Sequence, residues 1–183
     1  MMLPNADFLA VLKDAGLLTI NDVSEIENEA KAKGTPAYYL VLERQLATDD
    51  QIAKTMSKFY GVPQAPLGKI SIAEDVLKTV PELVARAKLV VPFARTAEGL
   101  KLATSDPHDL EIIEFIRKKT GDVILVSYAT PRQIDDAIRV YQKDIKTAFK
   151  NLLTESEAEA KRTGRPVEDS PGDGHPHQGF GRT

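Results

Sequence analysis

The stretch from Lys88 to Pro131 constrains the fold of this chain more than any other part of the sequence. It contains three apolar runs, LVVPFAR, LKLATS and DVILVS, of which the first two flank the short turn Thr96-Ala97-Glu98-Gly99. Runs of this length and composition, bounded by turn residues, are typical of strands. Pro92 cannot donate a backbone hydrogen bond, so the first strand is predicted to lie at a sheet edge or to be bulged there.

A helix is predicted between the second and third strands. Asp106 is expected as its N-cap, with Pro107 at the first helical position and Asp109 in the first turn. One side of this helix is apolar and consists of Leu110, Ile113 and Ile116. A hairpin, a helix and a third strand predict a small α/β sandwich, in which helices pack on one face of a three-stranded sheet.

Further helices are expected on both sides of this unit. Short ones are predicted around residues 72–77 and from Pro81 onward, ahead of the first strand. A last helix is predicted to begin at Thr130, because Thr130 and Gln133 have the spacing of a capping box around Pro131. Its apolar stripe consists of Ile134, Ile138, Tyr141 and Ile145 and continues through Phe149 and Leu152.

The N-terminal part of the chain repeats itself loosely. Thr19 with Asp22, and Thr48 with Gln51, have the spacing of capping boxes and mark two helix starts. Each of these helices is expected to stop at a glycine followed by a proline two residues later, at Gly34-Thr35-Pro36 and Gly61-Val62-Pro63. With an apolar run ahead of each start, the pattern predicts two helical hairpins in tandem.

The chain is therefore predicted to have an α+β fold in three parts: a helical repeat subdomain over residues 1–64, the α/β sandwich over residues 65–154, and a disordered tail over residues 155–183. The segment from Val62 to Ser71 contains two prolines and a glycine, which is typical of a linker, and places the first boundary near Ala65. The tail is charged, rich in glycine and proline, and too poor in apolar residues to form a core.

Composition excludes several functional classes. The 183 residues carry a formal net charge of −3, which gives no overall reason to bind nucleic acid. The absence of cysteine excludes thiolate catalysis and cysteine-based zinc sites. No run approaches the roughly 18 apolar residues of a membrane span, so we expect no direct membrane insertion. A cytoplasmic location is expected, with peripheral attachment at the inner membrane as an alternative.

Candidate catalytic groups are few. The only Gly-Lys pair, Gly68-Lys69, lacks the surroundings of a phosphate-binding loop. His108 is interpreted as a solvated residue rather than a general base, and helix capping accounts for Asp106 and Asp109. Two histidines in the tail, His175 and His177, make a poor metal site. We therefore expect no catalytic residue, no metal site, no ligand-binding residue and no cofactor, and predict that the chain is not an enzyme.

A basic cluster ends the helix of the sandwich. Arg117, Lys118 and Lys119 complement the dipole at the C-terminus of that helix, which is the simplest interpretation. The alternative hypothesis makes the three residues a docking patch for a protein partner.

The order of these segments resembles the N-terminal region of type II secretion and type IV pilus assembly ATPases, also known as the MshE N-terminal domain. The resemblance covers about Asp7 to Tyr141. It rests on AGLLTINDV, QLATDDQIAKTMSKFYGVP, VPELVARAKLVVPFAR, GLKLATSDPHDLEIIEFI and ATPRQIDDAIRVYQ. In full-length relatives this region precedes a hexameric ATPase core, which is not recognisable here, so we expect a fragment, a stand-alone paralogue or a chain whose ATPase is encoded elsewhere.

The resemblance also implies a ligand, because some members of the family bind cyclic di-GMP through a repeated motif that begins Arg-Leu-Gly. The slot, meaning the position that corresponds to Arg-Leu-Gly, is filled in this chain by Asp7-Phe8-Leu9 in the first repeat and by Pro36-Ala37-Tyr38 in the second. Neither slot supplies the arginine, and Asp7 would repel a phosphate. Binding of cyclic di-GMP is therefore not expected through this motif.

These observations lead to two functional hypotheses. The first is a non-catalytic docking and regulatory module of a pilus or secretion motor, which contacts the ATPase core, an inner-membrane platform or a cytoplasmic adaptor. The alternative is a sensor that binds a cyclic dinucleotide through residues outside the motif.

Overall fold

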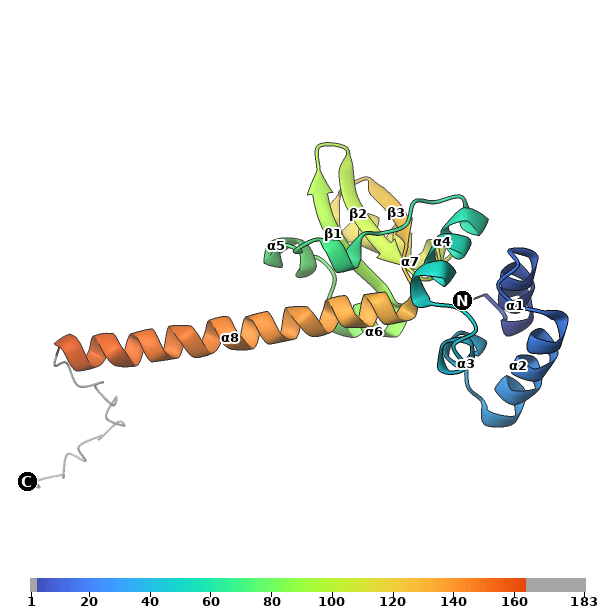
Figure 1. Cartoon of the computed structure of the whole chain (residues 1–183). Coiled ribbons are helices and arrows are strands. Elements are labelled where there is room, and N and C mark those ends of the chain that lie inside the picture. The colour runs from blue at the N-terminus through green and yellow to red at the C-terminus, as the bar shows by residue number, and fades with distance from the viewer. Residues whose placement is uncertain (1–2, 164–183) are drawn as a thin grey trace, which may run out of the picture. The chain divides into compact units, whose positions relative to one another are not determined.

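Two helical hairpins build the N-terminal part of the fold (Figure 1). The computed structural model describes residues 3–163, apart from the side chains of residues 140–145, 148–149 and 156–163. The four helices of the hairpins are α1 (Asn5–Asp14), α2 (Ile20–Lys33), α3 (Ala37–Glu43) and α4 (Asp49–Tyr60). Their inner faces form one cluster whose largest fully buried side chains are Leu9, Leu12, Ile26, Leu40, Ile52 and Met56.

The helix signals in the sequence are confirmed. The backbone N–H of Asp22 donates to Thr19 Oγ1, and that of Gln51 donates to Thr48 Oγ1, each at 3.2 Å. In both capping boxes the later side chain accepts from the N-cap backbone in return. Gly34 and Gly61 end α2 and α4 in the left-handed conformation, with φ of 65° and 68°.

The second part of the fold is a mixed three-stranded sheet. Its strands are β1 (Val90–Thr96), β2 (Gly99–Thr104) and β3 (Ile124–Tyr128), in the spatial order β1-β2-β3. β1 and β2 are antiparallel, and β2 and β3 are parallel and connected through α7 (Leu110–Thr120). β1 lies at an edge, and its register shifts between Pro92 and Ala94, so both predictions made from Pro92 are confirmed.

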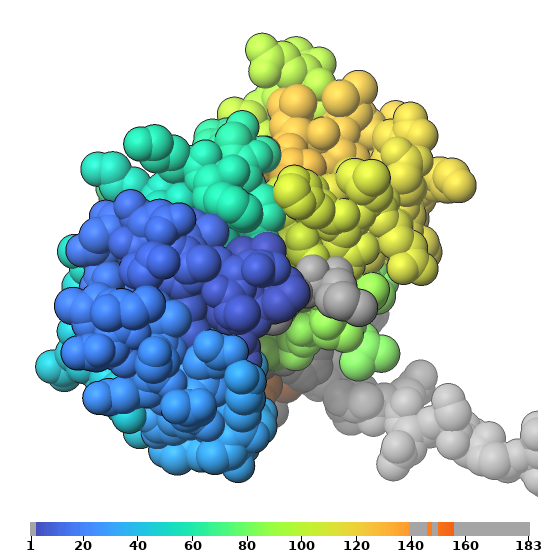
Figure 2. All heavy atoms as spheres, turned by 90° about the vertical axis from the view of Figure 1, so that its right-hand side faces the viewer, coloured from blue at the N-terminus to red at the C-terminus, as the bar shows by residue number. Residues whose placement is uncertain are grey.

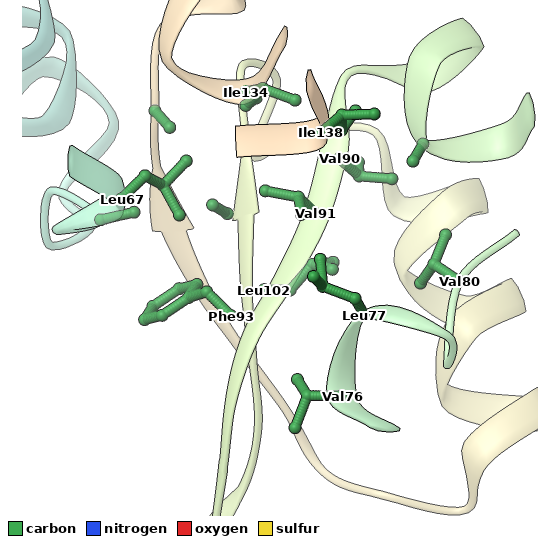
Figure 3. Close-up of a cluster of buried hydrophobic side chains, with 14 of the residues drawn as sticks. Leu67, Val76, Leu77, Val80, Val90, Val91, Phe93, Leu102, Ile134 and Ile138 are labelled. Carbon is green, nitrogen blue, oxygen red and sulfur yellow. The ribbon is translucent and has the colours of Figure 1, made fainter. Parts of the chain in front are cut away.

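The core of this part draws on helices before and after the sheet (Figure 3). They are η1 (Leu67–Lys69), α5 (Glu74–Leu77), α6 (Glu82–Lys88), α7 and α8 (Pro131–Thr163). Leu102 and Ala103 are neighbours on β2, so their side chains point to opposite faces, and both are fully buried. The sheet is therefore covered on both faces at this point, whereas the sequence predicted helices on one face.

The start of α7 also differs from the prediction. Its N-cap is Asp109, whose carboxylate accepts from the backbone N–H of Ile112 at 3.3 Å. Asp106 lies one turn earlier: its own N–H donates to Thr104 Oγ1, and its carboxylate accepts from the N–H of His108, each at 3.1 Å. Because Thr104 fixes Asp106 in this turn, the helix begins three residues later than its proline suggests.

The last helix begins where the sequence predicted and ends later than predicted. Thr130 and Gln133 form a capping box ahead of Pro131. α8 continues through residues 155–163, which the sequence analysis assigned to the tail. These residues are mainly Glu, Ala, Lys and Arg, which are strong helix formers, and this explains the difference. The expectations for Tyr141, Ile145 and Phe149 concern side chains outside the described part, as do those for all residues after Thr163, including His175 and His177.

The predicted linker is bound to the sheet. The N–H of Tyr128 donates to the carbonyl of Pro63 at 2.8 Å, and the N–H of Ala65 donates to the carbonyl of Tyr128 at 2.7 Å. Ala65 and Leu67 are both buried. The compact units of the chain are Met1–Lys143 and Asp144–Thr183, so the helical repeats and the sheet fall in the same unit. The predicted subdomain boundaries, residues 1–64, 65–154 and 155–183, stay predictions.

Gly99 offers a test of the hairpin geometry. It has a φ of +145°, and a Cβ added to it would lie 2.2 Å from the carbonyl oxygen of Val123. Gly99→Ala is therefore expected to lower the free energy of unfolding by more than about 2 kcal/mol, measured by urea denaturation. Gly68→Ala is the matched control, because nothing lies within 4 Å of its added Cβ. Equal effects of the two substitutions would contradict this account of the turn.

Candidate functional site

The predicted docking cluster lies in the last turn of α7. Arg117, Lys118 and Lys119 are all exposed, and the Arg117 guanidinium contacts the Glu114 carboxylate at 2.6 Å. Within the described part of the chain no ion pair is seen for Lys118 or Lys119. The structure adds Phe115, which is 48% exposed and lies one turn earlier on the side of Lys118 and Lys119. The sequence analysis singled out the three charges but not Phe115.

A second group of functional interest joins the helical repeats to the sheet and to the start of α8. Figure 2 shows the helical repeats, in blue to teal, next to the yellow segment that contains α7. The Asp49 carboxylate, in the first turn of α4, accepts from the Tyr38 hydroxyl at 2.5 Å and from the Thr130 hydroxyl at 2.9 Å. Thr130 is itself the N-cap of α8, so one carboxylate connects α3, α4 and α8.

Tyrosines surround this group. The rings of Tyr60 and Tyr128 stack with centroids 5.7 Å apart, and the His108 ring meets Tyr60 edge-on at 5.1 Å. Burial, with the nearby Asp106 charge, raises the pKa of Tyr60 to about 12. Burial, and then the hydrogen bond to Asp49, raises the pKa of Tyr38 as well, and burial raises that of Tyr128. These hydroxyls therefore stay protonated at physiological pH, and that of Tyr38 donates to Asp49.

A small cavity of about 30 Å³ lies beside the tyrosines. It is lined by α1, α3, α4, the ends of β2 and β3, and the first residue of α8. Its lining residues are Leu3, Asn5, Phe8, Pro36, Tyr38, Met56, Tyr60, Ser105, Tyr128 and Pro131. A space of this volume suits about one or two water molecules, so a nucleotide does not fit without movement of the walls.

The slots of the Arg-Leu-Gly motif lie in α1 and at the start of α3. Phe8 and Leu9 are buried in the helical core, and Tyr38 is occupied by its bond to Asp49. Asp7 is exposed and carries a negative charge where the motif has arginine. These side chains therefore stabilise the helices and offer no cationic group to a phosphate.

The remaining candidates have structural roles. Asp109 caps α7 and contacts Lys88 at 3.6 Å. Burial opposes ionisation of Asp109, but the Ile112 N–H and the Lys88 charge together hold its pKa below the ordinary value. His108 packs against Tyr60. Across the residues whose side chains are described, no group of three His, Asp or Glu is placed to hold a metal ion.

Tyr38 provides a test of the connection through Asp49. Tyr38→Phe removes a buried donor to a carboxylate and is expected to lower the free energy of unfolding by about 1–2 kcal/mol, measured by urea denaturation. Tyr39→Phe is the matched control, because the Tyr39 side chain is 45% exposed, and it is expected to have little effect. A loss of the same size in both variants would argue against a structural role for this hydrogen bond.

Comparison with known proteins identifies a family and relatives to which this chain is similar. The MshEN domain family matches residues 60–148. The type IV pilus assembly ATPase PilB of Myxococcus xanthus is 25% identical over 137 residues, which cover 75% of this chain and 24% of PilB. PilB of Thermus thermophilus is 30% identical over 118 residues, which cover 63% of this chain and 13% of that protein. The chain thus spans only a small part of the length of these relatives.

Solved structures have the same fold. The structure of MshE with cdg, the ligand cyclic di-GMP, superposes with a TM-score of 0.58 at 19% identity, covering 73% of this chain and 97% of the other. The N-terminal domain of XpsE gives a TM-score of 0.55 at 19% identity, covering 76% of this chain and 97% of the other. Both matches cover a larger share of the chain than residues 60–148.

Within the described part, no helix combines the length and the apolar character needed to span a membrane. The resemblance predicted from the sequence is confirmed: residues 60–148 match the MshEN domain family, and the similar proteins are PilB pilus assembly ATPases.

Proposed function

We propose that this chain is a non-catalytic docking and regulatory module of a type IV pilus assembly or type II secretion motor. The observation that carries the proposal is the match to two pilus assembly ATPases, over 24% and 13% of their lengths. The proposal includes no turnover of nucleotide. It places the chain in the cytoplasm, in contact with an ATPase core, an inner-membrane platform or a cytoplasmic adaptor.

The surface at the end of α7 supports the proposal. Phe115 is half-exposed, and Lys118 and Lys119 follow it at the spacing that places side chains on one side of a helix. An aromatic residue beside exposed positive charges suits a partner segment that is apolar at its centre and acidic at its edge. The α7 helix is held by Ile112 and Ile116 in the core, so the surface is rigid.

The alternative function is a cyclic di-GMP sensor. The structure of MshE with that ligand favours it, and weakens the expectation that this chain does not bind cyclic di-GMP. The two motif slots count against it, because Asp7 replaces the arginine of the first and Pro36 that of the second. Calorimetric titration of the full chain with cyclic di-GMP separates the two functions: saturable heat at micromolar concentration would support the sensor.

Charge reversal tests the docking surface. The triple variant Arg117→Glu, Lys118→Glu, Lys119→Glu is expected to reduce the amount of pilus or secretion motor components captured at low salt by about tenfold or more. Folding should be unaffected, because all three side chains are exposed. Capture of these components from an extract, quantified by mass spectrometry, is the measurement.

The matched control reverses three exposed lysines elsewhere in the same compact unit, Lys54, Lys58 and Lys69, with the same change in net charge. The control variant should retain capture. If the control loses capture and the α7 variant retains it, the docking surface includes the control lysines and the assignment to α7 is wrong.

A further inference from the structure

The exposed side of α7 carries an acid, an aromatic residue and a base in a row. Glu111, Phe115 and Lys118 are all exposed, and the Phe115 side chain is 48% exposed. Their spacings of four and three residues place them within about 60° of one another around the helix, so they form one stripe along it. A single exposed aromatic residue is ordinary. Its position between opposite charges, one turn away on either side, gives the stripe a direction.

The stripe is complementary to itself when its direction is reversed. Glu111 lies about 6 Å before Phe115 along the helix axis, and Lys118 lies about 4.5 Å after it. In an antiparallel pair of such helices centred on Phe115, Glu111 of each copy is therefore level with Lys118 of the other copy, to within about 1.5 Å.

The two charges also lie on the same flank of the helix. Glu111 and Lys118 are seven residues apart, which is about 20° around the helix. A two-fold axis between antiparallel helices brings equal flanks of the two copies together, so the acid of one copy faces the base of the other. The positions along the axis and around it thus agree.

We propose that the stripe on α7 pairs with α7 of a second copy of this chain in antiparallel orientation, with the two Phe115 side chains at the centre. Two pairs of Glu111 with Lys118 of the other copy flank this centre. A parallel pair would instead set each acid level with the same acid and each base level with the same base, which is unfavourable. The self-complementary charges are the argument for a second copy as the occupant.

This pairing covers the surface assigned to docking. Phe115 and Lys118 cannot contact a motor component and a second copy at the same time, so self-pairing competes with docking and regulates it. This regulatory part of the inference rests on the proposed function, whereas the pairing itself does not. The α7 helix needs no rearrangement for either contact, because Ile112 and Ile116 hold it in the core.

Self-association of the full chain is the first measurement. Sedimentation from about 1 to about 500 µM should show a reversible monomer–dimer equilibrium, because a single helix pair buries little area. Phe115→Ala is expected to raise the dissociation constant by more than about tenfold. Phe59→Ala is the matched control, because Phe59 is a phenylalanine on α4 that is 50% exposed, and it should leave the equilibrium unchanged.

Charge exchange tests the orientation. Glu111→Lys alone and Lys118→Glu alone should each raise the dissociation constant at low salt by about threefold or more, because each sets like charges level with one another. The combined variant Glu111→Lys, Lys118→Glu should regain the self-association of the unaltered chain, since the opposite pairs are restored with exchanged signs. A parallel pair would not give this pattern, because each position faces its own copy.

Three results would overturn the pairing: a monomer over the whole concentration range, a dimer that Phe115→Ala leaves unchanged, or a combined charge variant that does not regain self-association. None of these results bears on docking, which the triple charge reversal tests by capture.

The competition is tested with Glu111→Lys, which weakens self-pairing and leaves Arg117, Lys118 and Lys119 in place. At a concentration where the unaltered chain is dimeric, this variant should capture more of the pilus or secretion motor components than the unaltered chain does. If capture occurs but does not increase, self-pairing does not compete with docking and the regulatory part is wrong. If neither chain captures these components while the dimer behaves as described, the proposed function fails and the pairing stands.

Discussion

The short segment from Tyr128 to Thr130 holds the first compact unit together. The Tyr128 side chain belongs to the buried cluster of the helical repeats, while its backbone ends β3 and pairs with Pro63 and Ala65. Two residues later the Thr130 hydroxyl binds Asp49 of α4 and starts α8. Each hydrophobic cluster is small for an independent domain, and this segment is where the two share residues and hydrogen bonds. This segment therefore connects the helical repeats to the start of α8.

Local signals in the sequence were sufficient for most of the fold. Hydroxyl residues three positions ahead of an acid or amide, and glycines ahead of prolines, act within one turn of a helix, so Thr19, Thr48 and Gly34 behave as predicted. The N-cap of α7 was misplaced because Thr104, on a strand, fixes Asp106. The hydrogen bond between the Thr130 hydroxyl and the Asp49 carboxylate joins residues far apart in the chain, so no local sequence pattern predicts it.

The candidate site residues divide in the same way: local sequence signals indicate some of them, and others depend on contacts between distant parts of the chain. The exposed end of α7 was proposed from charge alone, and the structure adds Phe115, whose exposure depends on which side of the helix packs on the sheet. The cavity beside Tyr60 and Tyr128 depends on contacts between the helical repeats and the sheet, which sequence periodicity does not specify. The proposed docking function would use surfaces rather than reacting groups, and so would account for how little recognisable chemistry the sequence carries.

Hydrogen exchange under native conditions tests the coupling through β3 most directly. The account predicts that buried amides within α1, α4 and β2, such as those of Leu9, Met56 and Leu102, open with the same free energy, equal to that of global unfolding measured with urea. Exchange of the helical amides at a distinctly lower free energy, with β2 still protected, would show that the helical repeats unfold alone. That result would contradict the claim that the segment from Tyr128 to Thr130 joins the two clusters into one cooperative unit.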